Sequence, residues 1–235
     1  MRPINSLLRS LSPEDYAILE KHLHPVTLPH GTVIYEPEAV VQSVYFPEQG
    51  LISLITVMLS GAQVESAVVG REGGVGFVEA AGAGIIFSRA VVQIDLVGLR
   101  APAHAYNAAL NASASLRRTI AAHIELTIAE GRQTIACIAH HQAEQRLAWW
   151  LLECQDRTGL ERLPLTQEFL SAMLAVQRTT VTQLAMIFKA EKLIDYSRGV
   201  ITILDRQRLE RKSCECYATS RHFRHLIEGD LIPAQ

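Results

Sequence analysis

Short runs of β-prone residues alternate with glycine and proline between positions 26 and 100. These runs are Thr32–Tyr35, Val40–Phe46, Leu51–Val57, Val64–Val69 and Arg89–Val97. Many short strands at near-regular spacing are typical of an antiparallel roll or barrel. Residues 3–24 precede them and have a helical pattern, in which Ser12 is a plausible N-cap followed by Pro13. We therefore expect a β-roll that opens with a short helical segment.

After Pro102 the pattern becomes helical, and a long segment from Ser113 to His140 contains few helix breakers. Apolar or small residues recur along it at spacings of three and four: Ala121, Ile124, Ile128, Gly131, Ile135 and Ile138. Such a narrow a/d seam favours packing between two helices. We predict that it is a dimer interface between two copies of the chain, and burial within one domain is the alternative.

The segment from Gln142 to Leu204 has the pattern of helices followed by a hairpin. Residues 142–157 form one helical pattern, which Gly159 ends. Thr166 is a plausible N-cap for the next helix, Ala175 and Val176 make a short turn, and another helix starts near Gln177. Apolar strands at 193–194 and 200–204 flank a turn at 196–199. This order predicts a winged helix-turn-helix, and with the preceding roll an α+β fold.

The second helix of this pair presents polar side chains opposite its buried side. Hydrogen-bonding groups in that position suit base edges and phosphates, whereas the alternative is a helix pair used only for packing. We predict DNA contacts from ten residues of the helix pair and the wing. They are Thr166, Gln167, Gln177, Arg178, Thr179, Thr180, Thr182, Gln183, Lys189 and Arg198.

The charged residues affect the DNA-binding prediction only through their local distribution along the chain. The 235 residues carry a net charge of −2, which excludes a basic polyelectrolyte but not a local DNA-binding patch. Residues 1–141 hold nine basic and twelve acidic side chains, and residues 142–235 hold thirteen and twelve. Within 162–198 the count is five basic against three acidic. Residues 142–235, where we predict DNA binding, are therefore only weakly basic.

Targeting and redox chemistry point to the cytoplasm. Four cysteines are too few for a disulfide-built secreted domain, and the first twelve residues contain no apolar signal core. The longest strongly apolar run lies between Glu48 and Glu65 and is shorter than the roughly 20 residues of a membrane span. We expect a cytoplasmic protein with reduced thiols and no membrane partner.

No residue pattern indicates catalysis or a metal site. His22-Leu-His24 has the spacing of cupin metal ligands, but a following carboxylate is missing. Cys214-Glu-Cys216 has no matching second pair, so we interpret it as an inert thiol pair, with a redox role as the alternative. His140 and His141 lie where the long helix should end, and we expect them to cap it. An enzyme on a cupin-like barrel is the alternative that the histidine pair keeps open.

Taken together, the chain resembles the Crp–Fnr family of bacterial transcription regulators over nearly its full length. The recognition helix of the family opens with Arg-Glu-Thr-Val, and here the run is Arg178-Thr179-Thr180-Val181. The resemblance implies that Arg178 contacts a guanine while Gln177 and Thr180 contact phosphates. Thr179 replaces a carboxylate and Gln183 replaces a second arginine, so we expect a different preferred base sequence.

The resemblance also implies domains and partners. We predict a sensor domain like a cyclic-nucleotide-binding β-roll over 1–112, a dimerisation helix over 113–141 and a winged helix-turn-helix domain over 142–235. The expected partners are a second copy of the chain, double-stranded DNA with a near-palindromic operator, and RNA polymerase. The expected function is regulation of transcription, not enzymatic catalysis.

The effector site departs from the family pattern. Members that bind cyclic nucleotides carry Phe-Gly-Glu and Arg-Ser-Ala runs, whereas this chain has Gly74–Glu79 and Ser88-Arg89-Ala90. The glutamate expected to hold the ribose is missing, and Arg89 is the one candidate for a phosphate, with a strand-edge charge as its alternative. No cysteine precedes Cys137, which excludes the N-terminal iron–sulfur cluster of some relatives. We identify no cofactor, leave the effector unknown, and keep a cyclic-nucleotide-responsive regulator as the alternative.

Overall fold

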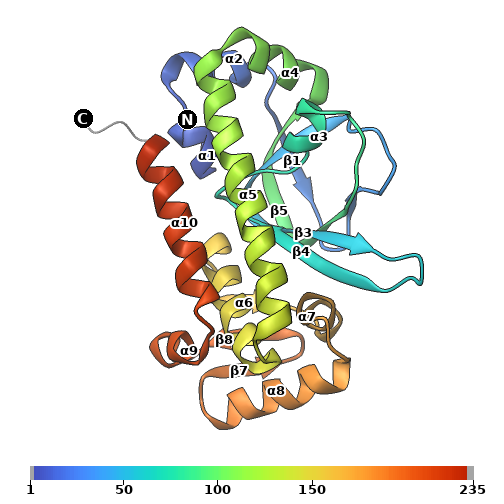
Figure 1. Ribbon diagram of the computed structural model, residues 1–235, viewed down its shortest axis with the longest axis vertical. Helices are drawn as coiled ribbons and strands as arrows, with labels where there is room; N and C mark the ends of the chain where they lie inside the picture. Colours follow the sequence, from blue (N-terminus) through green and yellow to red (C-terminus); the bar gives the residue numbers. More distant parts are fainter. Residues whose placement is uncertain (1–2, 232–235) are drawn as a thin grey trace.

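A five-stranded antiparallel sheet forms the N-terminal half of the computed structural model, which describes residues 3–231 (Figure 1). The described strands run in the order β1-β5-β3-β4, and β2 pairs with β5. Two short helices precede the sheet, α1 (Ser6–Ser10) and α2 (Pro13–Glu20). Ser12 caps α2 as predicted, because its hydroxyl accepts from the Asp15 amide at 3.1 Å. The strands are β1 (His24–Leu28), β2 (Val33–Tyr35), β3 (Ser43–Val57), β4 (Gln63–Val69) and β5 (Arg89–Pro102).

β3 corrects the sequence interpretation, which split this region into two strands at Pro47 and Gly50. The strand continues through both residues because irregularities in its pairing with β5 absorb them. Gly50 has φ +91° and lies so close to β5 that a Cβ would meet the Asp95 carbonyl oxygen at 2.3 Å. Only glycine combines this backbone angle with this approach. β1 was also missed, because Pro25 lowers the strand signal.

Two helices close the roll, α3 (Phe77–Ala81) and α4 (Ala103–Ala112). Phe77 lies between Phe46 and Tyr106, with ring centroids 5.0 and 5.5 Å away. All three side chains are buried in the apolar cluster that fills the roll. This cluster also contains Leu116 and Ile120 from the next helix, so the long helix is anchored on the β-roll.

The long helix α5 (Ala114–His140) runs from the top of the roll to the C-terminal half (Figure 1). Ser113 caps it through a hydrogen bond of its hydroxyl with the Leu116 amide, 3.2 Å. The final helix α10 (Cys216–Leu231) lies alongside α5 and returns toward the N-terminus (Figure 1). The helical backbone of α10 continues through Gly229 to Leu231, although glycine often ends a helix.

The C-terminal half contains the predicted helix pair and wing. Gly159 ends α6 (Ala143–Thr158) in the left-handed conformation, with φ +70°. Helices α7 and α8 follow, and a three-stranded sheet of order β6-β8-β7 packs beside them. The bounds are β6 (Arg162–Pro164), α7 (Gln167–Leu174), α8 (Arg178–Ala190), β7 (Ile194–Ser197), β8 (Val200–Ile203) and α9 (Arg206–Lys212).

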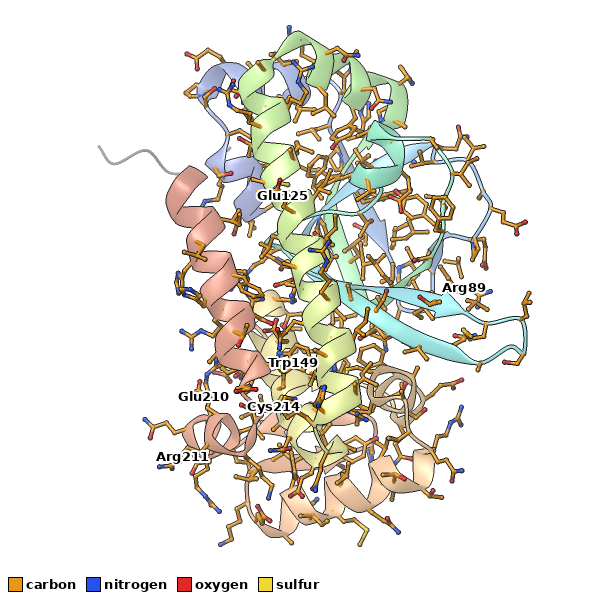
Figure 2. All side chains as sticks on the ribbon, in the orientation of Figure 1. Arg89, Glu125, Trp149, Glu210, Arg211 and Cys214 are labelled. Carbon is orange, nitrogen blue, oxygen red and sulfur yellow. The ribbon has the colours of Figure 1, made fainter. Side chains whose placement is uncertain are left out.

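The two halves share a buried junction. Trp149 and Trp150 of α6 stack with ring centroids 5.0 Å apart and are each 3% exposed. The same apolar cluster includes Leu51, Val68 and Ile94 of the roll. The C-terminal half is therefore packed directly against the sheet, near the lower end of α5 in Figure 2. Within residues 3–231, none of the helices is long and apolar enough to cross a membrane.

Candidate DNA-binding surface and its control elements

The turn between α7 and α8 sets the angle of the second helix. The Thr166 hydroxyl accepts from the Phe169 amide at 3.2 Å and starts α7, as the sequence predicted. Ala175 ends α7 in the left-handed conformation with φ +50°. Val176 donates its amide to the Ser171 carbonyl at 3.1 Å and completes the cap. Ala175 is not glycine, so the turn keeps this left-handed geometry at a conformational cost.

The structure brings the predicted DNA-contacting residues onto one surface around α8. Val181, Leu184, Ala185 and Phe188 face the core, which leaves the opposite side of α8 in solvent. Exposed members of the predicted set are Thr166, Gln177, Arg178, Thr179, Gln183, Lys189 and Arg198, and the half-buried members are Gln167, Thr180 and Thr182. Their contacts with DNA stay predictions.

Two cations of this surface are ion-paired within the chain. Arg178 lies 2.9 Å from the Glu168 carboxylate, and both side chains are more than half exposed. Lys189 lies 2.7 Å from Asp195 and 3.3 Å from the Tyr196 carbonyl oxygen, so it holds strand β7 against α8. Exposed pairs of this kind contribute about 0–1 kcal/mol, so phosphates or base edges can compete for the cations.

The wing turn and one apolar side chain complete the surface. Arg198 and Gly199 have φ values of +50° and +77°, the pattern of a two-residue hairpin turn with both central residues left-handed. The turn places the Arg198 guanidinium in solvent beyond the strands. Met186 of α8 is 67% exposed on the same helix as Arg178, and sequence reasoning missed it. The spacing 179, 182, 183 and 186 along one helical face is the signal that identifies it.

The predicted seam of α5 is divided between solvent and half-buried positions. Ile135 is 71% exposed and Ile128 45% exposed, and Ala121 is exposed further up the helix. The other three members, Ile124, Gly131 and Ile138, are half-buried. The buried side of α5 is formed instead by Leu116, Ile120, His123, Leu126, Thr134 and Cys137. A row of isoleucines is thus left uncovered on a helix that already packs on its own chain.

The interior of the roll holds a cavity of about 60 Å³. Tyr35, Phe77 and His123 are among its lining residues. Burial lowers the pKa of His123 to about 4, so the imidazole is neutral at physiological pH. Arg89 does not line the cavity but pairs with Glu36 at 2.9 Å at the start of β5 (Figure 2). The arrangement matches the strand-edge alternative for Arg89.

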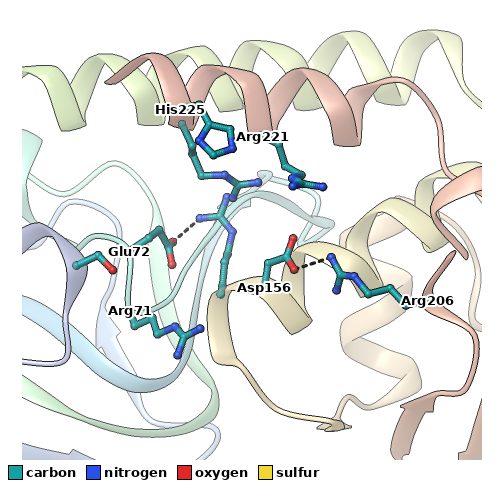
Figure 3. Close-up of a pocket in the computed structure, with 9 residues that line it drawn as sticks. Arg71, Glu72, Asp156, Arg206, Arg221 and His225 are labelled. Atoms are coloured by element: carbon teal, nitrogen blue, oxygen red, sulfur yellow. Dashed lines mark hydrogen bonds and ion pairs between the residues drawn. The ribbon is translucent and has the colours of Figure 1, made fainter. Parts of the chain in front are cut away.

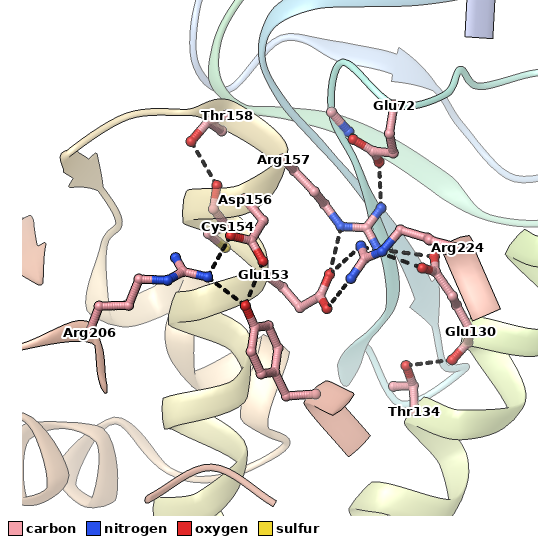
Figure 4. A network of polar contacts seen from close by, with 12 residues as sticks. Glu72, Glu130, Thr134, Glu153, Cys154, Asp156, Arg157, Thr158, Arg206 and Arg224 are labelled. Carbon is pink, nitrogen blue, oxygen red and sulfur yellow. Dashed lines mark hydrogen bonds and ion pairs between the residues drawn. The ribbon is translucent and has the colours of Figure 1, made fainter. Parts of the chain in front are cut away.

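A largely buried network of two arginines and three glutamates joins α5, α6 and α10 with the turn after β4 (Figure 4). Arg157 of α6 contacts Glu72, and it lies 3.0 Å from Glu130 of α5 and 3.1 Å from Glu153. Arg224 of α10 pairs with Glu153 at 2.6 Å. Burial alone would raise the pKa of Glu153, but Arg157 and Arg224 hold it below its ordinary value. The β-roll, the long helix and the C-terminal half are thereby connected by one set of ion pairs.

A larger cavity of about 320 Å³ lies beside this network at the junction (Figure 3). Its lining residues are mostly cationic: Ser6, Arg71, Glu72, Asp156, Arg157, Arg206, Arg221, Arg224 and His225. Its volume is in the range of small-molecule sites, about 300–1,000 Å³, and its charge suits a small anion. Sequence reasoning missed it because its arginines come from the roll, α6, α9 and α10.

The cysteines give the clearest departure from the sequence interpretation. Cys214 and Cys216 do have partners, because Cys137 and His141 at the end of α5 lie beside them. His141 is the C-cap residue of α5, as expected, and its side chain lies beside these thiols. The spacing Cys137-x-x-x-His141 was the available signal, since residues four apart share one helical face. This spacing alone does not identify the cluster, because the contacting residue Cys214 lies 77 positions further along the chain than Cys137.

The fold of this chain is similar to the folds of several solved transcription regulators. A CRP/FNR-family transcriptional regulator from Thermus thermophilus matches with TM-score 0.67 and 25% identity, over 81% of this chain and 98% of its own. FixK2 from Bradyrhizobium japonicum matches with TM-score 0.72 and 15% identity, over 82% and 98%. The c-di-GMP-responsive regulator CLP from Xanthomonas campestris matches with TM-score 0.68 and 11% identity, over 83% and 100%. No curated protein matches the sequence.

A sensor-like β-roll, a long helix and a winged helix-turn-helix define a class of two-part DNA-binding regulators. Residues 145–212 match the Crp-like helix-turn-helix domain family, which covers α6 to α9. The chain is a DNA-binding transcription regulator that contains a Crp-like helix-turn-helix domain, and its fold is similar to that of Crp–Fnr regulators, so the resemblance found in its sequence is confirmed.

Proposed function

We propose that the protein acts as a homodimer whose two α8 helices enter successive major grooves of a near-palindromic operator. The single observation that carries this proposal is the uncovered apolar row on α5, with Ile135 71% and Ile128 45% exposed. A parallel pairing of two such helices buries the row in a knobs-into-holes seam. The half-sites are then about 34 Å apart, one turn of DNA.

Base contacts come from the exposed side of α8. Arg178 is the guanine reader, because its guanidinium can donate two parallel hydrogen bonds to the O6 and N7 acceptors. Thr179, Thr182 and Gln183 follow on the same side and reach neighbouring base edges. Met186 offers an apolar contact for a thymine methyl group. Breaking the exposed pair with Glu168 frees Arg178 at a cost of about 0–1 kcal/mol.

Phosphate contacts orient the helix. Gln177 and Thr180 lie at the start of α8, and Thr166 and Gln167 lie at the start of α7, where helix amides also face an anion. Arg198 at the wing tip reaches the adjacent backbone, and Lys189 supports the wing through Asp195. Binding through these groups releases counterions and weakens as salt rises.

Control comes through the N-terminal half by an effector other than cyclic AMP. The roll cavity of about 60 Å³ is well below the roughly 300 Å³ of a small-molecule site, and Arg89 is held by Glu36 outside it. The similar regulator CLP responds to a different ligand, c-di-GMP. An effector shifts the DNA-competent state only by binding it better than the other state. The Arg157 network connects the domains that such a shift must move.

We place this activity in the cytoplasm, with RNA polymerase as the protein that reads the occupied operator. The domain limits we propose are 1–112 for the sensor, 113–141 for the dimer helix and 142–235 for the DNA-binding part. The helix α10 belongs to the last of these by sequence, yet it packs along α5 and contributes Arg224 to the network.

Fluorescence anisotropy on operator and random duplexes tests the proposal. Arg178→Ala should cost about 1–3 kcal/mol on the operator, a roughly 5- to 150-fold loss, and much less on random DNA. Arg118→Ala, at the exposed upper end of α5, is the matched control and should leave both affinities unchanged. An equal loss on all sequences would contradict a base-reading role for Arg178.

A further inference from the structure

Three cysteines and a histidine converge where the long helix ends. Cys137 and His141 belong to the last turn and the C-cap of α5. Cys214, labelled in Figure 2, lies just before α10, and Cys216 is the first residue of that helix. Their four ligand atoms all lie within 4.8 Å of one another. The three cysteines are 4% exposed or less, and the His141 side chain is 21% exposed. No other function described above uses this cluster.

The distances suit tetrahedral coordination. The sulfurs of Cys137 and Cys214 are 3.5 Å apart, and the Cys216 sulfur is 3.4 Å from His141 Nδ1. Zinc bonds of about 2.3 Å to sulfur and 2.0 Å to nitrogen give tetrahedral edges of about 3.8 Å between sulfurs and about 3.5 Å between sulfur and nitrogen. Two edges therefore already have nearly the required length, and the other separations, none above 4.8 Å, need to shorten by at most about 1.3 Å.

Surrounding groups orient the ligands. Gln133 of α5 donates its side-chain amide to the Cys216 sulfur at 3.0 Å. The Glu215 carboxylate lies 3.9 Å from His141 Nε2, the ring nitrogen that faces away from the thiols. At this separation the carboxylate makes no hydrogen bond to the ring, but it lies on the side where zinc-binding histidines commonly have a carboxylate partner. If the cysteines served only as small apolar core residues, the contacts of Cys216 with the His141 ring nitrogen and the Gln133 amide would not be needed.

We propose that Cys137, His141, Cys214 and Cys216 bind one zinc ion that fastens the start of α10 to the end of α5. Three thiolates and an imidazole nitrogen are the ligand set of zinc, and four protein ligands leave no open position for substrate. The site is therefore of the structural type. Because α6 begins at Ala143, the ion sits at the hinge where the long helix passes into the DNA-binding half.

Metal analysis of the full-length protein, purified with reductant and without chelator, tests this proposal independently of DNA binding. Elemental analysis should find about one zinc per chain, and the metal-free protein should take up about one equivalent of cobalt with thiolate charge-transfer absorption. Zinc content below about 0.1 per chain after incubation with zinc, together with no cobalt absorption, would overturn the site.

Two matched pairs of variants locate the ligands. Cys214→Ala should abolish the cobalt absorption, whereas Cys154→Ala, at a buried cysteine outside the cluster, should retain it. His141→Gln should weaken metal binding at least tenfold, and the neighbouring His140→Gln should not. The histidine pair keeps the test decisive should Cys214→Ala fail to fold. Equal loss within either pair, or a Cys137–Cys214 disulfide found in reduced, zinc-treated protein, would contradict the proposal.

Discussion

Replacing Ile135 by serine on the uncovered side of α5 should weaken dimerisation and leave the single chain folded. The side chain is 71% exposed in the isolated chain, so most of its apolar surface has no contact there. Serine and isoleucine have similar helix propensities, so an exposed substitution should change the stability of the monomer by only a few tenths of a kcal/mol.

The magnitude follows from the exposed fraction. Complete burial of an isoleucine contributes about 1.5–3 kcal/mol, so covering the exposed 71% contributes about 1–2 kcal/mol for each chain. The two copies in a symmetric dimer contribute about 2–4 kcal/mol. Since about 1.4 kcal/mol is a factor of ten, the dimer dissociation constant should rise about 30- to 1,000-fold.

Sedimentation velocity over a dilution series measures this constant. Leu59→Ser is the matched control, because Leu59 is fully exposed at the β3–β4 turn, away from the seam. The control should dimerise like the unaltered protein. An unchanged dissociation constant for Ile135→Ser, or an equal rise for Leu59→Ser, would refute the assignment of the seam.

Three further predictions concern stability in urea. Arg157→Met leaves the network glutamates without their shared cation and should lower the free energy of unfolding by about 3–5 kcal/mol. The control Arg162→Met, at an exposed arginine, should lower it by under about 0.5 kcal/mol. Similar losses for the two variants would contradict the role of the network. Burial raises the pKa of Glu65 to about 8 from 4.5, so unfolding, which releases its proton, becomes easier as pH rises from 4.5 to 8. The Glu65→Gln variant lacks this titration, so its free energy of unfolding relative to the unaltered protein should rise by a few kcal/mol between about pH 5 and about pH 8.5. A difference between the two proteins that stays constant with pH would exclude the raised pKa of Glu65. Ala175→Gly should raise stability by about 0.5–1 kcal/mol, because glycine adopts φ +50° without strain; a loss of stability would count against strain at this turn.

Local patterns predicted much of the fold. Ser12 and Thr166 start their helices as expected, and Gly159 ends α6, because caps and left-handed glycines act within a few residues. The seam of α5 and the polar side of α8 followed from the helical period of about 3.6 residues. These features depend on neighbours in the chain, which a single sequence displays.

Features that depend on distant contacts were missed. β3 passes through Pro47 and Gly50 because its partner β5 tolerates the irregular pairing, and no local signal reports that. The network around Arg157 draws its glutamates from the roll, α5 and α6, and its second arginine from α10. The cysteine cluster joins residues 77 positions apart. In each case the residue types were visible in the sequence, but their proximity was not.

Sequencing of DNA fragments selected from a random pool by the purified protein tests the central claim most directly. A dimer that inserts two α8 helices should enrich a near-palindrome whose half-sites lie about 34 Å apart, one helical turn. Selection with Arg178→Ala should relax one base pair in each half-site and leave the spacing unchanged. Enrichment of a single asymmetric half-site, or no enrichment over the starting pool, would contradict a dimeric, sequence-specific regulator.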